Sequence, residues 1–322
     1  MSQPLLEVKN VSKIFRIGGL ISGQNIVAVD DISLTIEADK PVILSIVGES
    51  GCGKTTLCKM ILRLYKMNLG DINLMGRSYN DKKAYDAKTF KLDVQPIFQN
   101  PYETFSTRKP VDSYLFNTAL RLGIAKNKAQ ASEIIDDILK SVGMSLSVIR
   151  NKYSSQFSGG ELQRISIARA LITRPKLIIA DEPVAAIDAS MKMNIINLFK
   201  DLKDKYNVSF VYITHDLSTA YYVSDYIATL YKGSLIEYGQ AQSIMDAPAH
   251  PYTQLLMTSV PKVGDKWLDD TIADNETPLN QTKSHCKFAP RCPYATDICY
   301  NSPTPTKQID KTRKVLCNYP LI

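Results

Sequence analysis

The stretch Gly48-Glu49-Ser50-Gly51-Cys52-Gly53-Lys54-Thr55 lies between the apolar run Val42–Val47 and a segment with helical periodicity, Lys54–Leu64. It fits G-x-x-x-x-G-K-[ST], the phosphate-binding loop, which needs a strand before it and a helix after it. Backbone N–H groups of such a loop surround a polyphosphate, and the positive N-terminal end of the helix faces the same charge. The stretch therefore predicts a nucleotide site, and its flanking elements disfavour the alternative of an ordinary glycine-rich turn.

The loop residues have separate expected roles. Lys54 should reach the β- and γ-phosphates, and the Thr55 hydroxyl should bind Mg²⁺. The nucleotide-binding set consists of Gly48, Glu49, Ser50, Gly51, Cys52, Gly53, Lys54, Thr55 and Thr56.

Composition limits the class of protein. The chain has 322 residues, of which 44% are hydrophobic and 22% charged, as in soluble globular domains. No apolar run approaches the roughly 18 residues of a membrane span, and Met1–Glu7 lacks the regions of a signal peptide. We therefore expect a cytosolic protein whose membrane role would come through a partner. The net charge of +7 is spread along the chain, so nucleic acid is not an expected partner.

Hydrophobic patterns predict an α/β fold. Strands are expected at Leu6–Val11, Ile26–Val29, Ile32–Ile36, Asp71–Met75 and Val94–Phe98, with a loop at Gly18–Gly23. We expect these strands to form an antiparallel sheet against the phosphate-loop core. Helical periodicity at Val111–Leu122 and Lys128–Val142 predicts an inserted helical subdomain that ends near Phe157.

The later part of the chain predicts the parallel core. Helices Glu161–Ile172 and Ser190–Tyr206 alternate with apolar strands Leu177–Ala180 and Val208–Ile213, which indicates a parallel sheet. A hairpin (Tyr226–Tyr231 and Ser234–Tyr238), a short helix (Tyr252–Val260) and a polar stretch to Ser284 follow. The expected domains are 1–98, an antiparallel β subdomain with the first part of the core; 99–157, the helical subdomain; 158–246, the rest of the core; and 247–322, a cysteine-containing C-terminal extension.

Two further places carry candidate chemistry. Asp181 and Glu182 follow the apolar strand Leu177–Ala180. Ligands of open α/β sheets lie at the carboxyl ends of strands, so Asp181 is placed to hold Mg²⁺ and Glu182 to polarise an attacking water. Ser158 and Glu161 predict a capping box at the start of a helix, and Gly159-Gly160 between them leaves N–H groups for a second anion.

Phe157-Ser158-Gly159-Gly160-Glu161 resembles the signature sequence of ABC-transporter ATPases. The phosphate loop, Asp181-Glu182-Pro183 and Thr214-His215-Asp216 follow the family's order and spacing over residues 5–245. The resemblance implies a P-loop NTPase with a RecA-like parallel core that hydrolyses ATP with Mg²⁺. It also implies two subunits that enclose the nucleotide, so that Ser158, Gly159, Gly160 and Glu161 would contact the partner's ATP.

The same resemblance assigns further roles. Gln99 matches the Q-loop glutamine, which approaches Mg²⁺ and the attacking water, and His215 matches the switch histidine at the γ-phosphate. Phe15 matches the aromatic residue that stacks on adenine, although an aromatic on a first strand is more often a core residue. Asp188 matches the D-loop aspartate. Two residues depart from the pattern: Glu161 replaces the usual Gln, and Ala185 replaces the Ser that usually begins the D-loop.

A narrower resemblance concerns the oligopeptide/dipeptide importer ATPases. It rests on Gly18-Gly19-Leu20, Phe98–Tyr102, His250–Thr253 with Val260-Pro261, and a tail that contains Cys286, Cys292, Cys299 and Cys317. Some members bind a 4Fe-4S cluster through these cysteines. Four thiolates suit such a cluster or Zn²⁺; spacings of five, six and seventeen residues lack the close pairs of zinc sites, which favours the cluster. Four cysteines without a ligand are the third possibility.

The sequence therefore predicts the ATP-hydrolysing subunit of a peptide ABC importer at the cytoplasmic face of the membrane. Expected partners are a second ABC ATPase in a heterodimer, two transmembrane permease subunits and an extracellular or periplasmic substrate-binding protein. One alternative is an importer for nickel, metal chelates or sugars. Others are a soluble ABC ATPase acting on DNA or ribosomes, and a regulatory subunit that binds ATP but barely hydrolyses it.

Overall fold

The computed structural model describes residues 3–18, 23–81, 83, 85–258 and 285–322. Four predicted features lie partly or wholly outside these ranges. They are the loop Gly18–Gly23, the end of the helix Tyr252–Val260, the family motif Val260-Pro261 and the polar stretch to Ser284. The chain forms two compact units. The first contains Met1–Glu37, Leu44–Asn80 and Thr214–Ile322, and the second contains Ala38–Ile43 and Asp81–Ile213.

The first unit consists of strands and short helices. They are β1 (Leu6–Ile17), β2 (Gln24–Ile36), β3 (Ile43–Val47), α1 (Lys54–Ile61), β4 (Leu69–Leu74), β5 (Arg77–Ser78), α9 (Leu217–Val223), β9 (Tyr226–Tyr231), β10 (Ser234–Gln240), α10 (Ala241–Asp246), α11 (Pro251–Thr258), the 3₁₀ turn η2 (Ala289–Arg291), α12 (Asp297–Asn301), β11 (Thr306–Gln308) and β12 (Lys314–Leu316).

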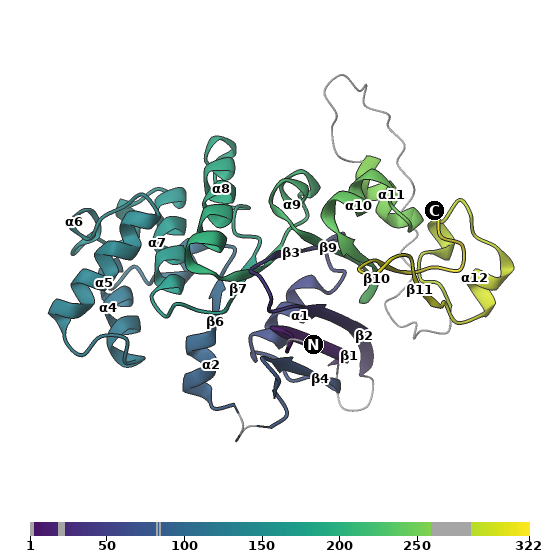
Figure 1. The fold of residues 1–322 in the computed structure, drawn as a ribbon, viewed down its shortest axis with the longest axis horizontal. Coiled ribbons are helices and arrows are strands. Elements are labelled where there is room, and N and C mark those ends of the chain that lie inside the picture. The colour runs from purple at the N-terminus through teal and green to yellow at the C-terminus, as the bar shows by residue number, and fades with distance from the viewer. Residues whose placement is uncertain (1–2, 19–22, 82, 84, 259–284) are drawn as a thin grey trace. The chain divides into compact units, whose positions relative to one another are not determined.

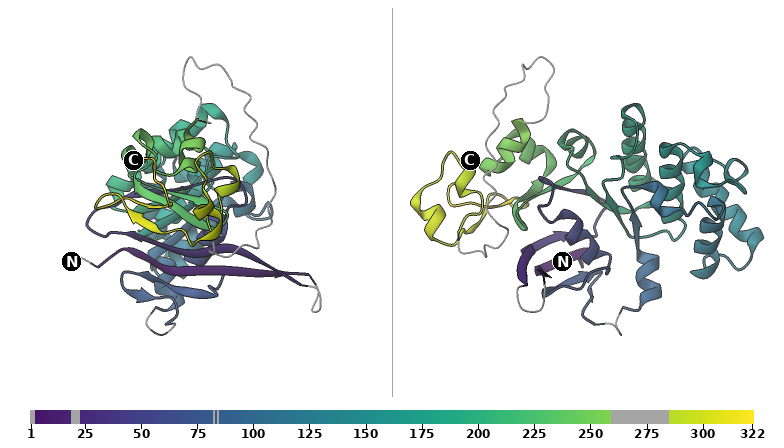
Figure 2. Two further views of the ribbon diagram at one scale, coloured as in Figure 1. Left: turned by 90° about the vertical axis from the view of Figure 1, so that its right-hand side faces the viewer. Right: turned by 180° about the vertical axis from the view of Figure 1, so that it is seen from behind.

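Four of these strands form an antiparallel sheet in the order β2-β1-β4-β5. Figure 2 shows β1 and β2 as a long paired ribbon. Val8, Ile32 and Ile72 are buried, each at the kind of alternating position that places side chains on one face of a strand. The antiparallel sheet predicted for the N-terminal strands is therefore confirmed, with β1 and β2 longer than predicted.

The remaining strands of the first unit lie in the order β11-β12-β10-β9-β3. All five residues of β3 are buried, and β3 runs parallel to β9. The predicted hairpin is present as β9 and β10. The C-terminal tail, for which the sequence predicted no strands, adds β12 antiparallel to β10, with Val315 opposite Glu237. The cysteine-containing tail is thus joined to the sheet that also contains β3.

The second unit contains three strands and most of the helices. They are α2 (Ala87–Asp93), β6 (Val94–Ile97), α3 (Pro101–Thr104), α4 (Val111–Arg121), α5 (Lys128–Ser141), α6 (Leu146–Ile149), the 3₁₀ turn η1 (Ser154–Gln156), α7 (Gly159–Leu171), β7 (Leu177–Asp181), α8 (Ala189–Tyr206) and β8 (Ser209–Ile213). Helix α2 was not predicted, although Asp86 caps it by accepting the N–H groups of Lys88 and Thr89. Among the helices in the described ranges, none combines the length and the apolar character that a bilayer crossing requires.

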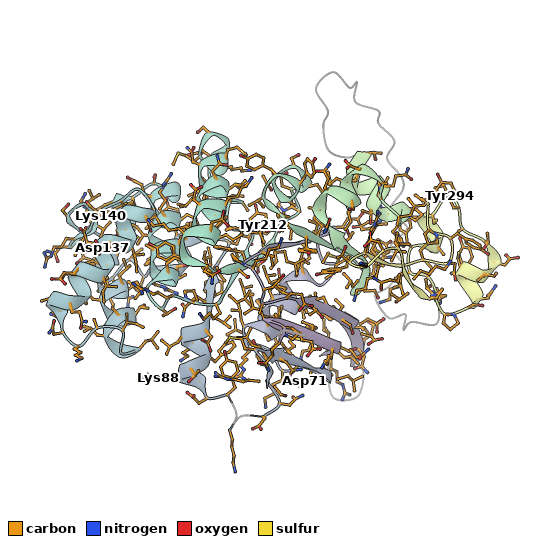
Figure 3. The ribbon with its side chains drawn as sticks, viewed as in Figure 1. Asp71, Lys88, Asp137, Lys140, Tyr212 and Tyr294 are labelled. Atoms are coloured by element: carbon orange, nitrogen blue, oxygen red, sulfur yellow. The ribbon has the colours of Figure 1, made fainter. Side chains whose placement is uncertain are left out.

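One strand prediction is wrong in its partner. Val94–Phe98 was expected in the antiparallel sheet, but β6 pairs parallel with β7, and β7 pairs parallel with β8. A long connection through helices separates β6 from β7, and such crossovers join parallel strands. Residues buried in β7 and β8 include Ile179 and Tyr212, which is labelled in Figure 3. The parallel sheet predicted for Leu177–Ala180 and Val208–Ile213 is confirmed.

The predicted helices of the second unit are present as α4, α5, α7 and α8, with ends within a few residues of the predictions. Figure 1 shows α4, α5 and α6 gathered beside α7. Their apolar faces bury Leu115, Ile135 and Leu139. Spacing of three to four residues between such positions places them on one side of a helix, which explains why this region packs without strands.

Candidate functional site

The phosphate loop follows the buried strand β3 and ends where α1 begins at Lys54. Gly48 and Gly53 have φ angles of 148° and 102°, which L side chains rarely adopt. A Cβ atom at Gly48 would lie 2.2 Å from the Leu230 carbonyl oxygen, and one at Gly53 would lie 2.3 Å from that of Ala28. These two positions therefore require glycine, because both the backbone angle and the close approach exclude a side chain.

The Lys54 ammonium folds back onto the loop. Its Nζ donates to the carbonyl oxygens of Gly48 (2.7 Å) and Glu49 (2.8 Å) and lies 3.8 Å from Cys52 Sγ. Burial raises the pKa of the Cys52 thiol, so this neighbour is neutral near pH 7. Lys54 is only 6% exposed, and a buried cation is poorly stabilised by neutral groups alone. A phosphate group fits this site because its negative charge would stabilise the buried ammonium.

Two other predicted nucleotide residues lie in the first unit. Phe15 is half-buried on β1, and its ring meets Tyr65 edge-on with centroids 5.5 Å apart. The Lys13 ammonium lies 5.0 Å from the same ring. His215 is exposed and immediately precedes Asp216, which caps α9. Tyr65 was not singled out from the sequence because it follows α1 outside any motif.

The second unit brings Gln99 and Glu182 together, although 83 positions separate them. Gln99 Nε2 donates to Glu182 Oε2 at 3.1 Å. Glu182 directly follows Asp181, the last residue of β7, and its N–H donates to the Ile213 carbonyl at 3.0 Å. Its φ angle of 44° is uncommon for a residue with a side chain. Uncommon backbone conformations of this kind occur often at functional sites.

The predicted capping box is confirmed at the start of α7. Ser158 Oγ accepts the Glu161 N–H at 3.3 Å, and Glu161 Oε2 accepts the Ser158 N–H at 2.8 Å. The next residue packs closely against the D-loop region, since a Cβ at Gly159 would lie 3.3 Å from the Ala186 carbonyl oxygen. Asp188 is exposed and is the N-cap residue immediately before α8. The helix start and the D-loop are thus neighbours within the second unit.

The four C-terminal cysteines line one pocket of the first unit, together with His250 and Tyr319 among others. Burial raises the pKa of Cys286 and Cys292, and that of Cys317 to about 11. The open space at the pocket centre is about 10 Å³, close to that of one water molecule. Within the described ranges, no three His, Cys, Asp or Glu side chains are close enough to hold a single metal ion. The described residues therefore give no support to a zinc ion, and they do not show the predicted 4Fe-4S cluster either.

The sequence missed the contacts that hold Glu49 of the phosphate loop. Tyr252 on α11 accepts its N–H, and Arg291 in η2 binds its carboxylate. Tyr252 had a signal in the sequence, the His250–Thr253 block, but Arg291 had none apart from its place beside Cys292.

Comparisons with known proteins agree with these motifs. The chain matches the ABC transporter family over residues 29–185 and the oligopeptide/dipeptide transporter C-terminal region over residues 236–299. It is 35% identical to the oligopeptide transport ATP-binding protein AppF of Bacillus subtilis (strain 168), over 98% of this chain and 97% of that protein. It is 30% identical to the di/tripeptide transport ATP-binding protein DppF of Pseudomonas aeruginosa (strain UCBPP-PA14), over 98% of both chains.

Solved structures show the same fold. The ATP-binding cassette MJ0796, in a dimeric post-hydrolysis state bound to ADP and Pi, matches with a TM-score of 0.62 and 26% identity, over 73% of this chain and 98% of that one. The matched families and the near full-length relatives agree with each other and with the loop geometry. The chain therefore belongs to the ABC-transporter ATPases, among the ATP-binding subunits of the oligopeptide/dipeptide branch.

Proposed function

We propose that this chain binds and hydrolyses ATP to energise the uptake of oligopeptides or dipeptides through membrane-spanning partner subunits. The observation that carries the nucleotide site is the buried Lys54 ammonium, held 2.7 and 2.8 Å from loop carbonyls beside a neutral thiol. A negatively charged β/γ-phosphate would stabilise this buried ammonium. The peptide cargo is supported by the relatives AppF and DppF, which are an oligopeptide and a di/tripeptide transport ATP-binding protein.

Within the site, roles follow from the chemistry of each side chain. Lys54 contacts the phosphates, and the Thr55 hydroxyl and the Asp181 carboxylate supply oxygen ligands to Mg²⁺. Glu182 orients and polarises the attacking water. The remaining assignments are Gln99 beside Glu182 as a water and Mg²⁺ contact, His215 at the γ-phosphate, Phe15 against adenine, and the backbone of residues 48–56 around the polyphosphate.

The Gln99–Glu182 hydrogen bond supports these catalytic roles. It restrains the carboxylate at 3.1 Å from an amide that can itself hydrogen-bond to a water. Phosphoryl transfer to water depends mainly on such positioning and on neutralising the phosphate charge. When bound, Mg²⁺ would supply part of that neutralisation.

Partner contacts belong to the same proposal. Ser158, Gly159, Gly160 and Glu161 face the nucleotide of a second ABC ATPase, and Asp188 contributes to that interface. We propose a heterodimer, docked on two permease subunits at the cytoplasmic face of the membrane and served by a substrate-binding protein outside it. The helical subdomain at 99–157 transmits the motion to the permeases, with 1–98, 158–246 and 247–322 as the other domains.

We also propose that Cys286, Cys292, Cys299 and Cys317 hold a 4Fe-4S cluster, which would supply electron-transfer or structural chemistry when bound. Their common pocket supports this, because a cluster binds each thiolate at a different iron and so accepts wider sulfur separations than one ion does. The small free volume means that the side chains must separate to admit it. Absorbance at about 400 nm that is lost in Cys317→Ser would support the cluster; stoichiometric zinc without iron would contradict it.

The cargo is tested in proteoliposomes that contain the complete transporter with this chain. ATP hydrolysis is measured with the substrate-binding protein loaded in turn with an oligopeptide, a dipeptide, a nickel chelate or a sugar. We expect stimulation by peptides. Stimulation by the nickel chelate or the sugar alone would assign the chain to a different importer. Purification with nucleic acid and no membrane protein would instead favour the soluble ATPase alternative.

A further inference from the structure

Glu49, the second residue of the phosphate loop, is held at three separate groups. Its backbone N–H donates to the Tyr252 hydroxyl at 2.9 Å. Its carbonyl oxygen accepts a hydrogen bond from Lys54 Nζ at 2.8 Å. Its carboxylate forms two parallel bonds of 3.0 Å with Nη1 and Nη2 of Arg291. The residue whose carbonyl oxygen binds Lys54 is therefore fixed by two side chains from the C-terminal part of the chain, 203 and 242 positions away.

These two side chains are themselves held rigidly. Tyr252 is fully buried, and its ring lies 4.5 Å from that of Tyr231 and 5.4 Å from that of Phe288. The Arg291 guanidinium lies 5.9 Å and 5.8 Å from the rings of Tyr231 and Phe288, within cation–π range. The hydrogen bonds to Glu49 raise the pKa of Arg291, so it stays charged. The two side chains that bind Glu49 of the phosphate loop are therefore held by an aromatic cluster that includes Tyr231 and Phe288.

The same cluster adjoins the cysteine pocket. Phe288 lines that pocket, and Arg291 immediately precedes Cys292, one of its four thiols. Backbone hydrogen bonds three residues apart hold the segment from Cys286 to Arg291 in tight turns. The Ala289 N–H donates to the Cys286 carbonyl oxygen, and the Arg291 N–H donates to the Phe288 carbonyl oxygen. A change in the packing of the cysteine region thus reaches the guanidinium over a distance of one residue.

We propose that Arg291 is a positioning residue for the phosphate loop, holding Glu49 and through it Lys54, so that ATP binding is coupled to the packing of the cysteine region. This inference rests on the proposed nucleotide role of residues 48–56. A bidentate guanidinium–carboxylate pair fixes direction as well as distance, and the carbonyl of the same residue fixes the lysine. Coupling between two sites is reciprocal in binding free energy, so ATP must also stabilise the cysteine region.

The first test measures binding of a fluorescent ATP analogue to the full chain. We expect Arg291→Gln to weaken binding about fivefold, near the lower end of usual coupling between sites, because the Glu49 carboxylate is 40% exposed and partly screened. Arg291→Lys keeps the positive charge but cannot form the two parallel hydrogen bonds of the guanidinium. Its affinity for the analogue should therefore lie between those of the wild type and Arg291→Gln. Lys314→Gln is the matched control: it removes a cation of the same region whose Nζ binds the Ser33 carbonyl on β2 instead of the phosphate loop. It should bind as the wild type does.

Glu49→Gln separates positioning from simple charge repulsion. If Arg291 only neutralises a carboxylate near the phosphates, removal of that carboxylate leaves binding equal or tighter. If Arg291 positions the loop, Glu49→Gln weakens binding, and Arg291→Gln adds less in the Glu49→Gln background than in the wild type. Lys54→Ala tests the nucleotide site itself. If this variant binds the analogue as the wild type does, the nucleotide assignment is rejected. If Lys54→Ala loses binding while Arg291→Gln binds as the wild type does, only the present inference is rejected.

The second test uses reciprocity. Amide hydrogen exchange of residues 285–301 is measured with and without ATP. We expect ATP to slow exchange there in the wild type and in Lys314→Gln, and to have no effect in Arg291→Gln. Equal protection by ATP in Arg291→Gln would overturn the coupling, even if that variant were less stable, because a purely structural role would leave the ATP-dependent difference intact.

Discussion

The buried ion pair of Glu237 and Arg313 fastens β12 to β10. Glu237 is fully buried and Arg313 is 4% exposed. Nε and Nη2 of the guanidinium lie 3.1 and 2.6 Å from Oε1 of the carboxylate, and Nη1 donates to the Ser243 carbonyl at 3.1 Å. The carboxylate also accepts the N–H groups of Ala249 (2.9 Å) and His250 (3.0 Å). One charged pair therefore connects β10, the residue immediately before β12 and the segment that precedes α11.

Arg313→Met keeps an unbranched side chain and removes the counter-charge. The Glu237 carboxylate would then remain buried with two backbone donors and no cation. Removing one partner of a buried pair costs about 3–5 kcal/mol. The exposed fractions of 0% and 4% give no reason to reduce this value for solvent screening. We expect the first unit to lose about 3 kcal/mol or more of its free energy of unfolding.

The assay is urea unfolding of the full chain, followed by far-ultraviolet circular dichroism. The double variant Glu237→Gln/Arg313→Met should lose less stability than the sum of its two single variants, because it leaves no orphaned charge. Lys140→Met is the control. Lys140 lies 2.8 Å from Asp136 and 3.6 Å from Asp137 with its side chain 63% exposed, and Figure 3 shows it on α5. Its loss should leave the unfolding curve unchanged.

Two results would refute the reasoning. The first is an Arg313→Met variant within about 0.5 kcal/mol of the wild type, the usual range for surface substitutions. The second is strict additivity of the two single variants, which would mean that the two charges do not interact. A loss of similar size in Lys140→Met would show that the assay responds to charge number and not to burial.

Three further predictions follow. Glu182→Gln should retain ATP binding and abolish turnover in the assembled transporter, and wild-type turnover would reject the assigned role. Burial lowers the pKa of His250 from 6.5 to about 3, so the unfolded state takes up the proton at a higher pH than the folded state does. The contribution of His250 to stability should therefore be constant well above pH 6.5 and fall as pH decreases, by about 2 kcal/mol at pH 5. His250→Gln should remove that part of the slope. Gly53→Ala should abolish binding of the ATP analogue because its Cβ would meet the Ala28 carbonyl at 2.3 Å, whereas Gly51→Ala has no atom within 4 Å and should bind more weakly without losing the site.

The sequence alone determined the features that depend on residues close together along the chain. The phosphate loop, the capping box of Ser158 and Glu161, and the hairpin at Lys232-Gly233 each depend on a few consecutive residues, so local spacing predicts them. The buried strands β3, β7 and β8 were also predictable, because continuous apolar runs are typical of parallel strands covered on both faces. The family resemblance followed from the order of these local motifs.

The tertiary structure decided which distant segments meet. Nothing local to Val94–Ile97 distinguishes a parallel from an antiparallel partner, and β6 was assigned to the wrong sheet for that reason. Likewise, Glu49, Tyr252 and Arg291 carry no periodicity that connects them, yet a bidentate ion pair and a hydroxyl join them across more than 200 positions. Side-chain pairing over such separations depends on how the chain packs as a whole. The loop sequence therefore predicts that phosphate binds, while the packing around Glu49 shows which residues hold the loop in place.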